Sequence, residues 1–128
     1  MSTPRIDYAE QLRNELTTML AAAELAKVTV TLNPLDIPSG SRHGVIVISP
    51  PDLEFPTFAH TDADYELSVI AGPADNLFAA WHRLDEIVEA LRVGELDMKS
   101  ARGDMFAPKT GQPLPGYTIT LNTVTIQD

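Results

Sequence analysis

The sequence contains no cysteine, and this absence removes several kinds of structure at once. Without thiols the chain forms no disulfide, holds no zinc ion through thiolates and has no cysteine nucleophile. Such a composition suits an intracellular setting. No apolar run approaches the roughly 18 residues of a membrane span, so we expect no contact with membranes. The opening residues, MSTPRIDYAEQL, lack a basic segment followed by an apolar one, so we predict no signal peptide.

Basic side chains are also scarce, since 9 Lys and Arg stand against 18 Asp and Glu and give a net charge of −9. Affinity for nucleic acid comes largely from Lys and Arg that release counterions from phosphates. The composition therefore disfavours direct nucleic-acid binding. It remains compatible with a protein that surrounds DNA without holding it.

The first half of the chain predicts one helix and two strands. Residues 5–26 have apolar side chains at helical spacing, with Thr3 as the N-cap and Pro4 in the first turn. Residues 28–32 alternate as a half-buried strand. The run VIVI at 45–48 is apolar on both faces, which predicts a central strand covered on both sides.

Two proline-containing segments separate these elements. Residues 34–44 are rich in Pro, Gly and Ser and predict a loop. Residues 49–60 contain three prolines, so we expect no regular strand pairing over most of that length.

A strand, a turn and a helix follow in the stretch ADYELSVIAGPADNLFAAWHRLDEIVEALRVG. The strand covers 63–72, Asp75 or Asn76 caps the helix, and Gly94 ends it. The only tryptophan, Trp81, belongs to an apolar stripe at spacings of 4, 3, 4 and 3, which predicts that it is part of the core. The stripe consists of Leu77, Trp81, Leu84, Val88 and Leu91, widened by Ala80 and Ile87.

The C-terminal part predicts a weak edge strand over 95–106, a loop over 107–116 and a strong closing strand. In that strand the apolar residues are odd-numbered up to Leu121 and even-numbered from Val124. The phase slip at Asn122-Thr123 predicts a bulge, or a strand whose halves face different neighbours.

The complete order is α-β-β-β-α-β-β. It predicts a single α+β domain over residues 1–128, with a mostly antiparallel sheet and two helices packed on one face.

The polar residues show no pattern of a catalytic or metal site. His60-Thr61-Asp62-Ala63-Asp64 has a metal-like composition but no metal-ligand spacing, and we interpret it as a solvated loop that leads into a strand. Ser39, Ser41 and His43 share one flexible loop and form no nucleophile elbow. The turn AGPADN lacks both the glycines and the lysine of phosphate-binding loops. We therefore predict no enzyme activity, no catalytic residue, no cofactor and no metal.

Surfaces are the remaining candidates for function. Leu53, Phe55 and Phe58 lie in the proline-interrupted segment 49–60. Exposed aromatics beside prolines are typical of docking sites, although a segment that folds back onto its own sheet explains these residues equally well. The end of the closing strand, with Asn122, Thr123, Val124 and Ile126, is a second candidate interface with a neighbouring subunit.

The order and character of the segments resemble the tail terminator (tail completion) proteins of long-tailed, lambda-like bacteriophages. The resemblance covers most of the chain. It lies in the helix YAEQLRNELTTMLAAAEL, the valine-rich strand after it, the stretch YELSVIAGPADNLFAAWHRLDEIVEALRVG and the closing β segment. The phrase VIAGPADN before a helix is similar to minor tail proteins of phages that infect actinobacteria.

This resemblance implies a structural virion protein rather than an enzyme. In that family a ring of six subunits caps the head-proximal end of the tail tube, ends its growth and joins the tail to the head. The implied partners are further copies of the chain, the tail tube protein and head-tail connector proteins. DNA passes through the lumen without specific binding. The implied location is the tail or neck of the virion, and the host cytoplasm during assembly.

Two other functions remain open from the sequence. Neck adaptors that join head to tail have related folds. A small ligand- or peptide-binding domain is the alternative from another class, and a pocket lined by Trp81, Phe55 and Phe58 would favour it.

Overall fold

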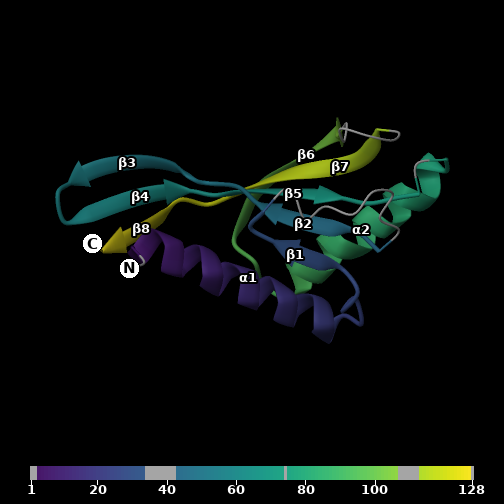
Figure 1. Ribbon diagram of the computed structural model, residues 1–128, viewed down its shortest axis with the longest axis horizontal. Coiled ribbons are helices and arrows are strands. Elements are labelled where there is room, and N and C mark those ends of the chain that lie inside the picture. The colour runs from purple at the N-terminus through teal and green to yellow at the C-terminus, as the bar shows by residue number, and fades with distance from the viewer. Residues whose placement is uncertain (1–2, 34–42, 74, 107–112, 128) are drawn as a thin grey trace.

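The computed structural model describes residues 3–33, 43–73, 75–106 and 113–127, and Figure 1 shows their arrangement. The fold is α+β, as predicted. A five-stranded sheet has the order β1-β2-β5-β7-β6, and a three-stranded sheet has the order β3-β4-β8. Neighbouring strands run antiparallel except for the parallel pair β1–β2. The elements are α1 (Pro4–Ala22), β1 (Thr29–Thr31), β2 (Val45–Ile48), β3 (Asp52–Thr57), β4 (His60–Asp64), β5 (Glu66–Ile70), α2 (Leu77–Val93), β6 (Met98–Phe106), β7 (Leu114–Leu121) and β8 (Val124–Gln127).

Helix α1 begins as the sequence predicts and ends earlier. The Thr3 hydroxyl accepts a hydrogen bond from the backbone N–H of Ile6 at 3.4 Å, and Pro4 is the first helical residue. The helix ends at Ala22 rather than at residue 26, because Glu24 takes the left-handed conformation with φ of 62° and reverses the chain.

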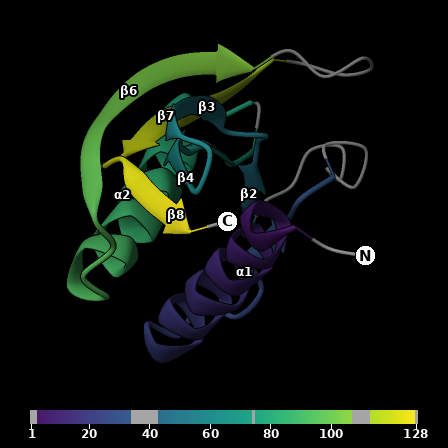
Figure 2. The same ribbon diagram turned by 90° about the vertical axis from the view of Figure 1, so that its left-hand side faces the viewer.

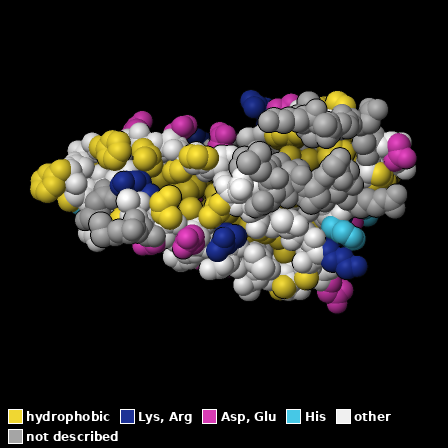
Figure 3. Space-filling model, in the orientation of Figure 1, with side chains coloured by type: hydrophobic (Ala, Val, Ile, Leu, Met, Phe, Trp, Pro, Cys, Tyr) yellow, Lys and Arg dark blue, Asp and Glu magenta, His cyan; other side chains and the backbone are white. Residues whose placement is uncertain are grey.

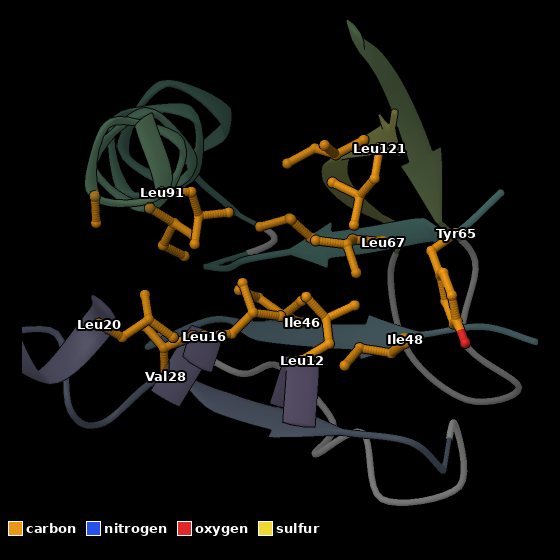
Figure 4. Packing of buried hydrophobic residues seen from close by; sticks show 14 of the residues in the cluster. Leu12, Leu16, Leu20, Val28, Ile46, Ile48, Tyr65, Leu67, Leu91 and Leu121 are labelled. Carbon is orange, nitrogen blue, oxygen red and sulfur yellow. The ribbon is translucent and has the colours of Figure 1, made fainter. Parts of the chain in front are cut away.

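Both helices pack on one face of the five-stranded sheet, as predicted (Figure 1). Figure 4 shows the core between them, to which α1 contributes a row of leucines one turn apart. Its labelled members are Leu12, Leu16 and Leu20 of α1, Val28, Ile46 and Ile48 of β2, Tyr65, Leu67 of β5, Leu91 of α2 and Leu121 of β7.

Strand β2 is central and covered on both faces, as the run VIVI predicts. Ile46 and Ile48 belong to the core under the helices, whereas Val45 and Val47 join a smaller buried cluster on the other face. Ile70 and Leu114 complete that second cluster, against which Phe106 packs. The alternation of strand side chains thus gives this sheet two apolar faces.

Helix α2 is rotated relative to the stripe that the sequence predicts. Asn76 caps it, accepting the Ala79 N–H at 3.1 Å, and Gly94 follows its last turn. However, Leu77 and Trp81 are 59% and 53% exposed, so the prediction that Trp81 belongs to the core is wrong. The buried face consists of Ala80, Leu84, Ile87, Ala90 and Leu91, and all of these except Ala90 belong to the predicted stripe.

The physical reason for the rotation lies in the small residues of that face. Two alanines allow the helix axis to approach the sheet and α1 closely, which a tryptophan at the same place would prevent. The two helices are in tight contact near Gly94, where a Cβ atom would lie 2.6 Å from Met19 Cγ.

The three-stranded sheet prolongs the three central strands of the larger sheet. Chain segments run directly from β2 to β3, from β4 to β5 and from β7 to β8, and the paired order is kept across each junction. The edge strands β1 and β6 take no part in this extension. We call residues 52–64 and 124–127 the arm, and Figure 1 shows it projecting from one end of the molecule.

Two predictions about secondary structure in the arm are wrong. Residues 52–57 form β3 and pair with β4, although the three prolines of residues 49–60 predict no regular pairing over most of that segment. Pro56 is tolerated because β3 is an edge strand and because the register shifts between Glu54 and Thr57. The stretch from His60 to Asp64 is strand β4, not a solvated loop.

The predicted edge strand near residue 100 is confirmed as β6. Of the two predicted loops, 34–42 and 107–112 lie outside the described residues, and so do Ser39 and Ser41. Residues 114–116 belong to β7 rather than to the second loop.

Candidate functional site

The arm places the predicted interface residues Leu53, Phe55 and Phe58 in exposed positions. Phe55 is 65% exposed and Phe58, in the turn between β3 and β4, is fully exposed, whereas Leu53 is 37% exposed. Hydrophobic side chains gather over this end of the molecule in Figure 3. Of the two readings open from the sequence, the structure supports the exposed arm rather than one folded back onto its sheet.

The root of the arm is held by the first turns of α1. The Tyr65 hydroxyl donates a hydrogen bond to the Arg5 carbonyl at 3.0 Å, and the rings of Tyr65 and Tyr8 lie 5.2 Å apart. Burial raises the pKa of Tyr65, and since even an unshifted phenol with a pKa of about 10 is protonated at neutral pH, this hydroxyl is a donor there. An Arg5 guanidinium nitrogen also lies 3.4 Å from the Thr61 hydroxyl on β4. These contacts fix the arm relative to the helix.

A mainly apolar groove of about 280 Å³ lies at this root. Among its lining residues are Ile6, Leu32, Pro50, Pro51 and Leu53. Pockets for small ligands usually occupy roughly 300–1,000 Å³. The volume of the groove is slightly below that range, and it suits one or two side chains of another protein.

The other side of the arm is acidic. Asp52 lies opposite Asp64, and Glu54 lies opposite Asp62, so two pairs of like charges face each other across β3 and β4. The Thr125 hydroxyl donates to Asp62 Oδ1 at 2.8 Å, and Thr123 donates to Asp64. Directly opposed like charges destabilise a strand pair. The arm therefore keeps an acidic face at some cost in stability.

The predicted phase slip at Asn122-Thr123 is confirmed. Glu66 lies opposite Thr120 and Ala63 lies opposite Val124, so the closing strand has one extra residue between its two sheets. Asn122 Nδ2 donates to Asp97 Oδ1 at 2.7 Å and fixes the junction.

The two halves of the closing segment contact different strands of the same chain. β7 pairs with β5 and β6, whereas β8 pairs with β4. Val124 is half-buried and Ile126 is only 8% exposed, so both help to hold the arm. Pairing of β8 with a neighbouring subunit stays a prediction. Such pairing would use the edge of β8 that faces away from β4.

A second exposed aromatic surface, which the apolar stripe in the sequence does not predict, lies at the start of α2. Leu77, Phe78 and Trp81 are all more than half exposed, and the rings of Phe78 and Trp81 meet edge to face with centroids 6.2 Å apart. A hollow of about 170 Å³ adjoins them, lined by Leu77, Trp81, Leu84, Gly103, Asp104, Pro115, Gly116 and Tyr117. The sequence signal was Phe78, a large aromatic residue off the apolar stripe.

The two aromatic surfaces are far apart. Figure 1 places the β3–β4 turn at one end of the longest axis and the first turn of α2 at the other. A pocket lined jointly by Trp81, Phe55 and Phe58 would have favoured a ligand-binding domain, and this arrangement does not form one.

Within the described ranges, no group of three or more His, Cys, Asp or Glu residues is placed to hold a metal ion. None of the helices in the part of the chain that the structure describes is long and apolar enough to cross a membrane. The sequence matches no protein-family model, and no curated protein shows significant similarity to it.

Proposed function

We propose that this protein is a structural subunit of a phage virion, which forms a ring at the head-proximal end of the tail tube, ends tube growth and joins the tail to the head. The observation that carries the proposal is the projecting arm with exposed apolar side chains. Aromatic residues that remain exposed on a rigid extension are the usual material of a protein–protein contact.

The construction of the arm suits such a contact. Three strands continue from the centre of the sheet, and Tyr65 and Arg5 anchor them to α1. A docking element held in one conformation loses little entropy on binding. The outer edge of β3 also carries Asp52, Glu54 and Pro56, the residue types that prevent indiscriminate pairing of edge strands. The arm is therefore suited to one partner geometry rather than to general aggregation.

The acidic face of the arm supports passage of DNA through the ring. Four carboxylates, those of Asp52, Glu54, Asp62 and Asp64, are concentrated on it. In a lumen they would repel phosphate groups within a Debye length of about 8–10 Å and keep the genome from adhering to the wall. We propose that this face lines the lumen.

A peptide-binding module is the second candidate, because the groove at the root of the arm is apolar and concave. It would accept one or two side chains of an extended segment. The same groove also serves the first proposal, as a place where the tube protein or a neighbouring subunit inserts a residue.

The test is binding to tail tubes assembled without this protein. The tubes are incubated with the purified chain, pelleted, and imaged at their ends. We expect the chain in the pellet as a ring at one end only. Leu53→Ala/Phe55→Ala should lose this binding while keeping its circular dichroism spectrum, and Val93→Ala, at an exposed apolar residue outside the arm, should retain it.

Two results would contradict the proposal. One is a wild-type chain that stays in the supernatant with every tube preparation. The other is binding along the whole tube with no preference for an end. Binding to isolated head connectors without binding to tubes would instead identify a neck adaptor.

A further inference from the structure

The aromatic surface at the start of α2 has the form of a receiving site. Leu77 and Trp81 of α2 and Tyr117 of β7 are among the residues that line the hollow. Gly103 and Gly116 also line it, and a Cβ atom at Gly103 would have no neighbour nearer than Tyr117 Cε1 at 3.8 Å, so the hollow stays open beside Gly103. Beside the hollow, Phe78 and Trp81 present more than half of their surfaces to solvent. The fold thus leaves an apolar concavity uncovered.

The tip of the arm has the complementary form. Phe58 is fully exposed in the turn between β3 and β4, where the chain projects farthest from the core (Figure 1). It cannot reach the hollow of its own chain, because the two lie at opposite ends of the longest axis (Figure 1).

We propose that the hollow beside Trp81 receives the Phe58 tip of a second copy of this chain. Such a contact joins two different patches, so it leaves one free tip and one free hollow at the ends of every complex. When the same contact is repeated, the copies form an open chain, or a closed ring if the rotation from one copy to the next adds up to a full turn. The proposed function requires the ring, and for that ring the inference rests on the proposed function.

Charge favours this pair of surfaces over other contacts between copies. With a net charge of −9, two copies repel each other over most of their surfaces. The tip, residues 57–60, contains no carboxylate, and its His60 ring lies 2.9 Å from the Thr57 hydroxyl. Asp104 lines the hollow, and Asp85 lines a neighbouring pocket on which Trp81 also borders. A tip without carboxylates therefore meets the acidic rim without like-charge repulsion, which the rest of the arm would suffer.

The size of the contact predicts a weak pairwise association. At about 150–250 Å² for each aromatic side chain, the exposed parts of Phe58, Phe78 and Trp81 supply roughly 450 Å². Stable complexes usually bury about 1,200–2,000 Å² in total. Two copies alone should therefore dissociate readily, whereas ring closure or a tail tube raises the effective concentration and holds them together.

The first experiment is disulfide trapping, for which the absence of native cysteine gives a clean background. Ala59→Cys/Leu77→Cys places one thiol beside Phe58 and one at the hollow. Ala59→Cys/Val93→Cys is the matched control, with its second thiol at the far end of the same helix. Under mild oxidation, both free at high concentration and on tail tubes, we expect a ladder of linked oligomers from the first variant and little from the second. Equal linkage, or none from the first variant under either condition, would overturn the inference.

The second experiment uses Trp81 as the only tryptophan fluorophore. Docking removes water from its ring, so the emission should shift to shorter wavelength as concentration rises. Phe58→Ala should abolish the shift, and Val93→Ala should retain it. The two single variants are then mixed: the Trp81→Ala chain keeps an intact tip, and the Phe58→Ala chain keeps an intact hollow. The mixture should restore the emission shift, and it should form a complex of two chains and no larger one. Failure of this mixture to restore it would refute the contact.

Failure of the inference and of the proposed function are distinguishable. A chain that binds one tube end as a ring without selective linkage between tip and hollow keeps the function and loses the contact. Selective linkage in a chain that binds no tube end keeps the contact and loses the function.

Discussion

Truncating two leucines of the same helix should have unequal effects on stability. The sequence places Leu77 and Leu91 on one apolar stripe, but the structure leaves Leu77 59% exposed and Leu91 fully buried. Leu→Ala removes three carbon groups, each worth about 0.8 kcal/mol when buried. For Leu91 the resulting cavity raises the loss to about 3–4 kcal/mol. For Leu77, where less than half of the side chain is covered, we expect about 1 kcal/mol.

Urea unfolding followed by circular dichroism measures both losses. The wild type and the two variants should give the same m-value, so that a change in midpoint reports a change in the free energy of unfolding. Leu84→Ala serves as a positive control, because Leu84 is 2% exposed and belongs to both the predicted stripe and the observed one.

The rotation of α2 would be refuted by equal losses for Leu77→Ala and Leu91→Ala. That result would mean that the stripe predicted from spacing faces the core and that Trp81 lies with it. A small loss for Leu77→Ala combined with a weaker concentration-dependent shift of Trp81 emission would instead link the exposed residue to self-association.

Three further predictions concern the sheet and the arm. Gly116→Ala should lower the free energy of unfolding by about 1–3 kcal/mol, because the new Cβ would lie 2.4 Å from the Val69 carbonyl oxygen. Gly103→Ala should be neutral or slightly stabilising, because its Cβ would have no neighbour nearer than 3.8 Å. Thermal unfolding of both variants checks this. Burial raises the pKa of Tyr65 in the folded protein, so the stability that this group contributes is complete below its unfolded pKa of about 10 and is lost as the pH rises through the folded pKa. In the wild type the urea midpoint should therefore fall above pH 10, and Tyr65→Phe should make this fall smaller. An equal fall in the variant would contradict the prediction. Asp52→Asn/Glu54→Gln removes the like-charge repulsion and should stabilise the fold by about 0.2–1 kcal/mol for each opposed pair. The gain should be larger at low salt than at high salt, because salt screens the repulsion. A variant that is less stable than the wild type at both salt concentrations would show that these carboxylates do not repel their partners.

Local sequence signals were sufficient where a residue acts within its own element. Thr3 and Asn76 cap their helices because a side-chain oxygen reaches a backbone N–H three residues on, whatever the rest of the fold does. The run VIVI had to be buried on both faces, because apolar side chains point both ways along it. The phase change at Asn122 required a break in pairing, and the structure has it there.

The orientation of α2 depended on contacts that are distant in sequence. Two apolar lines share Leu84 and Leu91, and helical periodicity cannot choose between them. The choice is made by how closely the helix approaches the sheet and α1, and Ala80 and Ala90 permit the closer approach. Trp81 is exposed as a consequence.

The arm required tertiary structure for a similar reason. Three prolines in residues 49–60 argued against a strand, yet a strand at a sheet edge needs hydrogen bonds on one side only, and position at an edge is a property of the sheet. By itself, the sequence determined the α+β class, the helix caps, the central strand and the break in the closing strand, because each follows from neighbouring residues. Only the tertiary structure decided which aromatic side chains remain exposed and that they lie at opposite ends of the molecule, because burial depends on which distant segments pack together.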